Sequence, residues 1–148
     1  MSKETFMTEE TVESEQEIKA EGLRILIVVD EQKICDLLRE YFLEDGHNVN
    51  SVSSGAMAIK LLETENFDLV LSDLVMPEVS GHDIIKAVGM LEKKPKVGII
   101  TGWADTKGIE KEGTSKADFI VRKPINFSEL TLCINNVLSK VNNIRMDK

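Results

Sequence analysis

Four polar residues follow short apolar runs in this sequence, and their side chains could together move a phosphoryl group. The four are Asp30, Asp73, Thr101 and Lys123. The carboxylates of Asp30 and Asp73 can hold Mg2+, a hard cation that takes few protein oxygens and keeps waters and phosphate oxygens as its other ligands. Asp73 could then attack phosphorus as an ionised nucleophile. The cation and Lys123 would offset charge on the equatorial oxygens, and Thr101 would donate a hydrogen bond to one of them.

The elements that must position these side chains can be read from the apolar pattern. Continuous branched runs are typical of strands covered on both faces, and the segments between them carry apolar residues at helical spacing. Strands are predicted at 25–29, 49–52, 69–71, 97–100 and 119–121, and helices at 34–42, 56–62, 84–91 and 130–141. This alternation predicts a three-layer α/β/α sandwich around a five-stranded parallel sheet. Because ligands bind beyond the carboxyl ends of parallel strands, the four polar residues would converge on one rim.

The helical pattern is poor in one later segment of the chain and clear in the closing helix. Between residues 105 and 113 the helical pattern is poor, because Gly108 interrupts it and Ile109 is its one large apolar residue. We expect this segment, which would form an additional helix between 84–91 and 130–141 and so be the fourth in chain order, to be the least stable element. Asn126, followed three residues later by Glu129, instead resembles the capped start of the closing helix.

Length and composition favour one soluble domain. The chain has 148 residues, of which 42% are hydrophobic and 30% are charged, the usual balance of a globular protein. The net charge is −8, and residues 1–23 hold seven Glu against two Lys. We predict a flexible acidic extension over 1–23, a folded domain over 24–141 and a short tail over 142–148. The sequence has no stripe of basic residues, so we do not expect it to bind nucleic acid directly. No apolar run reaches the ~18 residues that a membrane span needs, so we expect a cytoplasmic protein.

Four segments of the chain resemble the receiver domain of bacterial two-component response regulators. They are ILIVVDEQ (25–32), DLVLSDLVMPEVSGHDII (68–85), VGIITGWAD (97–105) and FIVRKPINFSEL (119–130). The ordered set is specific, whereas any one segment alone would be weak evidence. The resemblance covers about residues 24–141 and implies a flavodoxin-like fold with strand order 2-1-3-4-5. Because no output domain follows these segments, we expect a stand-alone receiver.

The resemblance also implies a role for each matching residue. Asp73 would be the phospho-acceptor, supplied by a phosphohistidine on a sensor histidine kinase or a histidine phosphotransfer domain. Asp30, Asp73 and the backbone carbonyl of Val75 would be the Mg2+ ligands, Thr101 the switch hydroxyl, and Lys123 the partner of the phosphorylated aspartate. The peptide bond after Lys123 would be cis. The domain would catalyse its own phosphorylation and dephosphorylation without being a conventional turnover enzyme. It would signal to a downstream protein through the fourth helix, the last strand and the last helix.

The sequence departs from the family pattern at the metal-binding acids. Val29 stands where most members have the first of two adjacent acids, so we expect weaker Mg2+ binding than is usual. Glu31 is a further candidate ligand that could compensate, although from the next position it need not face the ion. A Val29→Asp substitution should then tighten Mg2+ binding.

The aromatic positions depart from the pattern as well. The position three residues before Lys123 usually carries a switch aromatic and is Ile120 here, whereas the neighbouring ring belongs to Phe119. Successive strand side chains face opposite sides, so either the register shifts by one residue or no ring follows the hydroxyl of Thr101. Trp103 would border the site and, with Val75, would exclude water and slow self-dephosphorylation.

Two other functions are compatible with parts of this pattern. A degenerate receiver would keep the fold and dock partner proteins without phosphorylation, but such a protein has no need of Asp30, Asp73, Thr101 and Lys123 together. A phosphatase of the haloacid dehalogenase type also forms an aspartyl phosphate, but its Asp-x-Asp signature is absent after Asp73. We expect His47 and His82, which lie beside no nucleophile or second ligand in the sequence, to be solvated.

Overall fold

The computed structural model describes residues 22–102 and 116–146, and the side chains up to residue 138. The predictions made for most of the acidic extension, for Trp103 and for the weak helix at 105–113 lie outside the described residues. Within the described ranges, no helix is both long and apolar enough to cross a membrane.

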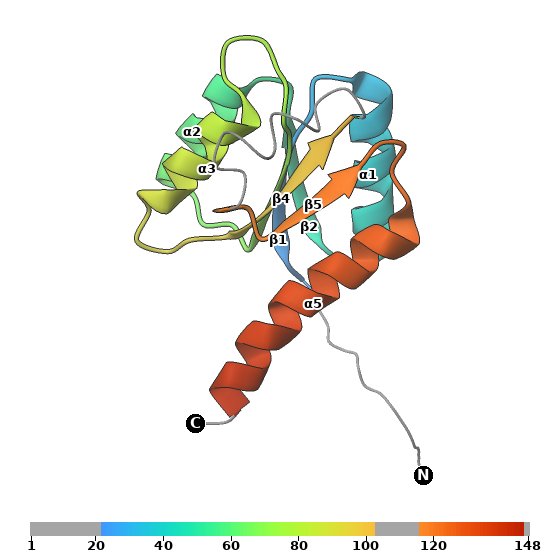
Figure 1. The fold of residues 1–148 in the computed structure, drawn as a ribbon, viewed down its shortest axis with the longest axis vertical. Coiled ribbons are helices and arrows are strands. Elements are labelled where there is room, and N and C mark those ends of the chain that lie inside the picture. Colours follow the sequence, from blue (N-terminus) through green and yellow to red (C-terminus); the bar gives the residue numbers. More distant parts are fainter. Residues whose placement is uncertain (1–21, 103–115, 147–148) are drawn as a thin grey trace.

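Strands and helices alternate along the chain around one parallel sheet (Figure 1). In chain order they are β1 (Arg24–Val28), α1 (Gln32–Glu44), β2 (Asn48–Val52), α2 (Gly55–Thr64), β3 (Leu69–Asp73), α3 (Gly81–Gly89), β4 (Lys96–Thr101), β5 (Phe119–Arg122) and α5 (Phe127–Met146). The sheet has the order β2-β1-β3-β4-β5, and all four strand pairs are parallel. The predicted fold and strand order are therefore confirmed.

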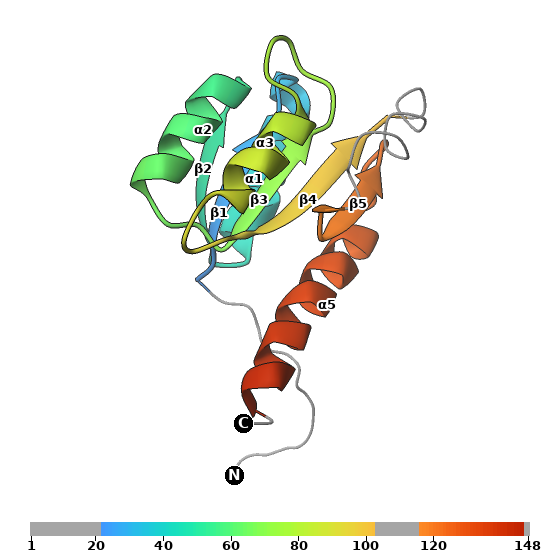
Figure 2. The ribbon, with the colours of Figure 1, turned by 60° about the vertical axis from the view of Figure 1, so that its left-hand side comes forward.

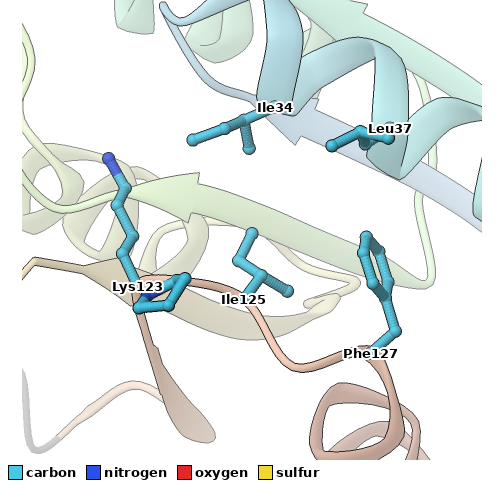
Figure 3. A pocket seen from close by; sticks show the side chains of 6 residues that line it. Ile34, Leu37, Lys123, Ile125 and Phe127 are labelled. Atoms are coloured by element: carbon cyan, nitrogen blue, oxygen red, sulfur yellow. The ribbon is translucent and has the colours of Figure 1, made fainter.

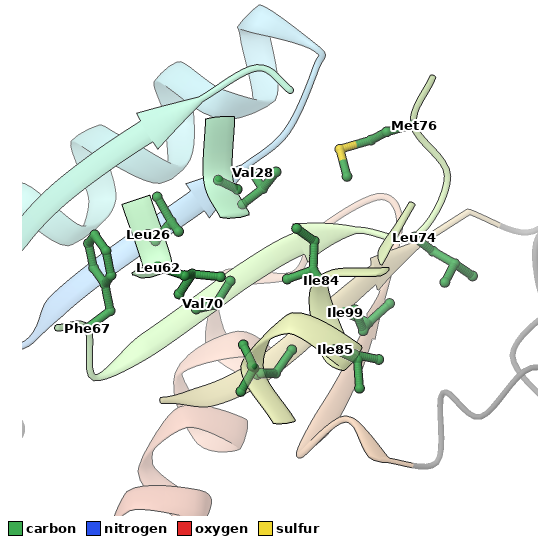
Figure 4. Close-up of a cluster of buried hydrophobic side chains, with 13 residues drawn as sticks. Leu26, Val28, Leu62, Phe67, Val70, Leu74, Met76, Ile84, Ile85 and Ile99 are labelled. Atoms are coloured by element: carbon green, nitrogen blue, oxygen red, sulfur yellow. The ribbon is translucent and has the colours of Figure 1, made fainter. Parts of the chain in front are cut away.

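The alternation of side chains along each strand divides the core into two apolar layers. Leu26 and Val28 of β1 belong to a buried cluster with residues of α2 and α3 (Figure 4). Ile25 and Ile27 belong to a second cluster with residues of α1 and α5. Figure 2 shows the same arrangement, with α2 and α3 on one face of the sheet and α1 and α5 on the other. Because both faces are covered, the central strands β1 and β3 are nearly continuous apolar runs, as predicted, whereas the edge strand β2 is more polar.

β3 lies between β1 and β4, and all five of its residues are buried. The chain turns back tightly after it. The backbone N–H of Leu74 donates to the Ile100 carbonyl at 2.8 Å, and that of Gly81 donates to the Leu74 carbonyl at 2.8 Å. A Cβ atom at residue 81 would lie 2.8 Å from the carbonyl oxygen of Asp73. Glycine is therefore required there, and the loop after β3 keeps the end of the strand in place.

The aromatic ring of β5 packs on the α1 and α5 side of the sheet. Phe119 pairs with Gly98 of β4, and a Cβ on Gly98 would come within 2.3 Å of the ring. Ile120 contacts the opposite cluster, which contains Ile99. Thr101 is two residues beyond Ile99 and therefore belongs to the same face as Ile120. The sheet register therefore places Ile120, and not the ring of Phe119, on the face of Thr101.

The predicted cap of the closing helix is present. The side-chain Oδ1 of Asn126 accepts a hydrogen bond from the backbone N–H of Glu129 at 3.0 Å. This bond satisfies one of the N–H groups that a helix leaves unpaired at its start. α5 continues to Met146, past residue 141, where the folded domain was predicted to end.

Candidate functional site

The carboxyl ends of β1, β3, β4 and β5 meet at one edge of the sheet, as the sequence predicted. Asp30 follows β1, Asp73 ends β3, Thr101 ends β4, and Lys123 follows β5. The structure brings two of these side chains into direct contact, because Lys123 Nζ lies 3.3 Å from Asp73 Oδ1. It also brings Glu31, which the sequence suggested only as a candidate metal ligand, to 3.0 Å from the same ammonium group.

Asp73 carries a carboxylate that is buried but unsatisfied. The residue is 2% exposed. Neither of its side-chain oxygens has a hydrogen-bond partner among the described residues, because the contact with Lys123 is an ion pair without hydrogen-bond geometry. Buried polar atoms in native proteins usually have partners, so two unpaired oxygens on one carboxylate indicate a group meant to bind something else.

The surroundings of Asp73 weaken it as an acid. Burial raises the pKa of its carboxyl, the positive charge of Lys123 lowers it, and the nearby carboxylate of Asp30 raises it again, so that the pKa lies at about 6. At neutral pH most molecules therefore carry Asp73 in the ionised form that a nucleophile requires.

Lys123 reaches the site from the connection between β5 and α5. Its peptide bond to Pro124 is cis, and its backbone N–H donates to the Thr101 carbonyl at 2.8 Å. Burial lowers the pKa of its ammonium group, but the hydrogen bond to Glu31 and the charge of Asp73 outweigh this effect, and the pKa lies above its usual value. The side chain is a permanent cation at the site.

Beside Lys123 the surface is hollowed by a cavity of about 230 Å³ (Figure 3). Its other lining residues come from α1, from the chain between β5 and α5, and from the first residue of α5: Ile34, Leu37, Pro124, Ile125 and Phe127. Figure 3 shows Ile34 and Leu37 on one wall, Ile125 and Phe127 on the opposite wall, and Lys123 at one end. The Lys123 side chain therefore lies between the polar edge of the sheet and an apolar surface.

The hydroxyl of Thr101 does not contact the carboxylate. It is buried, and it donates a hydrogen bond to the carbonyl of Gly102 at 3.2 Å. To donate the predicted hydrogen bond to a phosphoryl oxygen, the Thr101 hydroxyl would have to give up its hydrogen bond to the Gly102 carbonyl.

The chemistry at this edge fits a magnesium ion. No group of three or more His, Cys, Asp or Glu side chains in the described ranges could hold a metal ion by itself. Mg2+ does not need such a group, because it is usually bound by one or two carboxylates together with waters and phosphate oxygens. The unpaired oxygens of Asp73, with the Asp30 carboxylate close enough to raise the Asp73 pKa, are ligands of the type that a hard cation takes.

Comparisons with known proteins show the family to which this chain belongs. A family model of the response regulator receiver domain matches residues 25–135. The chain belongs to this family. Response regulator SaeR of Staphylococcus aureus is 38% identical over 121 residues, a match that covers 79% of this chain and 51% of SaeR. The receiver thus spans about half the length of the curated relatives it matches.

Solved receiver structures have the same fold. TrrA of Thermotoga maritima, crystallised in complex with Mg2+ and BeF, is 32% identical with a TM-score of 0.69, and the match covers 77% of this chain and 97% of TrrA. A receiver domain protein from Clostridium thermocellum is 27% identical with a TM-score of 0.73, covering 82% of this chain and 98% of the other. Receiver domains belong to two-component systems and generally partner with histidine kinases.

Val29, which replaces the first acid of the family pattern, is a core residue in this receiver. It is 1% exposed and belongs to the cluster formed with α1 and α5. We expect Val29→Asp to lower the free energy of unfolding by about 2–3 kcal/mol without metal, because a carboxylate would enter apolar surroundings. If the new acid also binds Mg2+, the ion should restore part of this loss.

Urea unfolding of Val29→Asp with and without Mg2+ measures both effects, and Val29→Asn is the uncharged control. An equal loss of stability in the two conditions would show that the added carboxylate does not reach the ion, contrary to the expectation from the family pattern.

The raised pKa of Asp73 predicts how stability changes with pH. The folded state holds a proton at this carboxyl up to pH about 6, whereas the usual value is 3.8. Between these values the folded state binds more protons than the unfolded state, so stability falls as pH rises. In metal-free buffer, we expect Asp73→Asn to be more stable than the wild type at pH 7 and nearly equal to it at pH 4. Urea unfolding at both pH values checks this, and a constant difference would contradict it.

Proposed function

We propose that this receiver is a cytoplasmic signalling switch that accepts a phosphoryl group on Asp73. The group would come from a phosphohistidine on a sensor histidine kinase or a histidine phosphotransfer domain, and the phosphorylated surface would then engage a downstream protein. The observation that carries this proposal is the buried carboxylate of Asp73, whose two oxygens accept no hydrogen bond from the described residues and which has a lysine ammonium group 3.3 Å away. A structural aspartate at such a position would be hydrogen-bonded.

The transfer itself exchanges one bond for another. An ionised oxygen of Asp73 forms a bond to phosphorus while the bond from phosphorus to the donor's ring nitrogen breaks, and the bonding electrons leave with the imidazole. Asp73 ends the buried strand β3, and the tight turn at Gly81 follows it, so the nucleophile would have little freedom to lose when the donor binds. Lys123 stabilises the negative charge on the equatorial oxygens.

We assign the magnesium site to Asp30, Asp73 and the backbone carbonyl of Val75. When bound, the cation would neutralise charge on the phosphoryl oxygens. The complex of TrrA with Mg2+ and BeF supports this assignment, because TrrA is a relative with 32% identity. Thr101 would exchange its bond to the Gly102 carbonyl for one to the phosphoryl group.

Intact mass spectrometry tests the function. The purified receiver is incubated with acetyl phosphate and Mg2+, and we expect a mass gain of one phosphoryl group. The group should be released by hydroxylamine, which cleaves acyl phosphates and leaves phosphate esters intact. A chain that gains no mass, or a modification that survives hydroxylamine, would refute the assignment.

One observation favours the second candidate, a receiver that docks partners without phosphorylation. Val29 is buried in the apolar core at the position where most family members have the first acid of the metal site. If acetyl phosphate leaves the chain unmodified at high Mg2+ concentration, the docking function becomes the better assignment.

A further inference from the structure

Glu31 has an unusual position for a residue at the start of a helix. It is the N-cap residue of α1, but its side chain makes no capping hydrogen bond. Its carboxylate instead accepts a hydrogen bond at 3.0 Å from Lys123, which is 92 positions away in the sequence. The side chain of an N-cap residue commonly stabilises its helix by accepting a backbone hydrogen bond. At Glu31, the contact with Lys123 takes the place of such a bond.

The Lys123 ammonium group is shared between two carboxylates. Its distance to Glu31 Oε1 is 3.0 Å, with hydrogen-bond geometry, and its distance to Asp73 Oδ1 is 3.3 Å, as an ion pair only. In the unphosphorylated state, the better of the two contacts is therefore the one to Glu31. The phosphoryl group needs the same cation for its equatorial oxygens.

We propose that Glu31 is a positioning residue that retains Lys123 in the unphosphorylated receiver and thereby slows phosphorylation of Asp73. The Glu31 carboxylate competes with the incoming phosphoryl oxygens for the Lys123 ammonium group. Phosphorylation requires Lys123 to give up part of this contact. This inference rests on the proposed function, and it gives Glu31 a role through Lys123 in place of a role as a metal ligand.

The size of the effect follows from the exposure of the pair. The Glu31 side chain is 58% exposed and that of Lys123 is 30% exposed, so water screens their attraction and the contact is weak. We expect Glu31→Gln to raise the initial rate of phosphorylation by acetyl phosphate about two- to fivefold at saturating Mg2+. A metal ligand at this position would give the opposite result, because its loss would weaken Mg2+ binding and slow the reaction.

Three further variants connect the effect to Lys123. In a Lys123→Gln background, Glu31→Gln should leave the rate unchanged, because the cation it acts on is gone. Glu40→Gln removes the same charge from an exposed position on α1 and should leave the wild-type rate unchanged. Urea unfolding of the four Glu31 and Lys123 combinations, without metal or donor, should show a coupling of about two- to fivefold in the unfolding equilibrium constant.

Each outcome decides the proposal. If the wild type is phosphorylated but Glu31→Gln is equally fast or slower, the inference is wrong and the proposed function stands. An equal acceleration in the Lys123→Gln background would also overturn it, because Glu31 would then act without Lys123. If the wild type is not phosphorylated at all, the proposed function fails and the inference fails with it.

Discussion

The Asp73→Asn variant is expected to gain no phosphoryl group from acetyl phosphate and Mg2+ under conditions that modify the wild type completely. An amide has nearly the same shape as the carboxylate but cannot form an acyl phosphate. The loss should not come from unfolding, because the buried carboxylate has an ion pair with Lys123 but no hydrogen bond that the substitution would remove. Intact mass after incubation gives the result directly.

A matched control separates this effect from a general change in charge. Asp45→Asn makes the same substitution at the exposed end of α1 and should be phosphorylated like the wild type. Hydroxylamine-sensitive modification of Asp73→Asn at the wild-type rate would show that another carboxylate is the acceptor. Asp30 would then be the next candidate, because it shares the same edge of the sheet.

Lys123→Gln is expected to slow phosphorylation about a hundredfold, the usual loss when one preorganised group that stabilises the transition state is removed. Two effects act in the same direction. The phosphoryl oxygens lose a cation, and the pKa of Asp73 rises further because the charge of Lys123 normally lowers it. Less of the nucleophile is then ionised at pH 7.

The rate of Lys123→Gln should therefore recover partly as pH is raised from 6 to 8, more than the wild-type rate does. Lys60→Gln, which removes an exposed lysine on α2, is the control and should behave like the wild type. Initial rates across this pH range check the prediction. A variant within a factor of about three of the wild-type rate would show that Lys123 carries little of the transition-state charge, since ordinary losses are far larger.

The sequence was sufficient to predict most of the fold and the convergence of Asp73 and Lys123, for a physical reason. Strands covered on both faces must be apolar throughout, so their ends are marked by the first polar residue. Parallel connections then bring those ends to one edge. The family resemblance supplied the strand order and the cis bond at Lys123, and the structure has both.

Contacts made by side chains beyond the strand ends could not be predicted in the same way. Glu31 meets Lys123 across 92 positions, and no local spacing encodes such a pair. The prediction of a solvated His47 was wrong, because this residue is buried and its Nδ1 accepts a hydrogen bond from the backbone N–H of Leu23 at 3.2 Å. A histidine in a turn gives no sign of a partner 24 positions earlier.

The opposite orientations of Phe119 and Ile120 affect how a signal could leave the site. An aromatic ring that rotates about χ1 has two well-separated positions. A β-branched aliphatic side chain is stiff at χ1 and has few other rotamers. Ile120 is the β5 side chain on the face of Thr101. A partner protein on that face would therefore sense a small, graded displacement of the strand instead of a side chain that is either in or out.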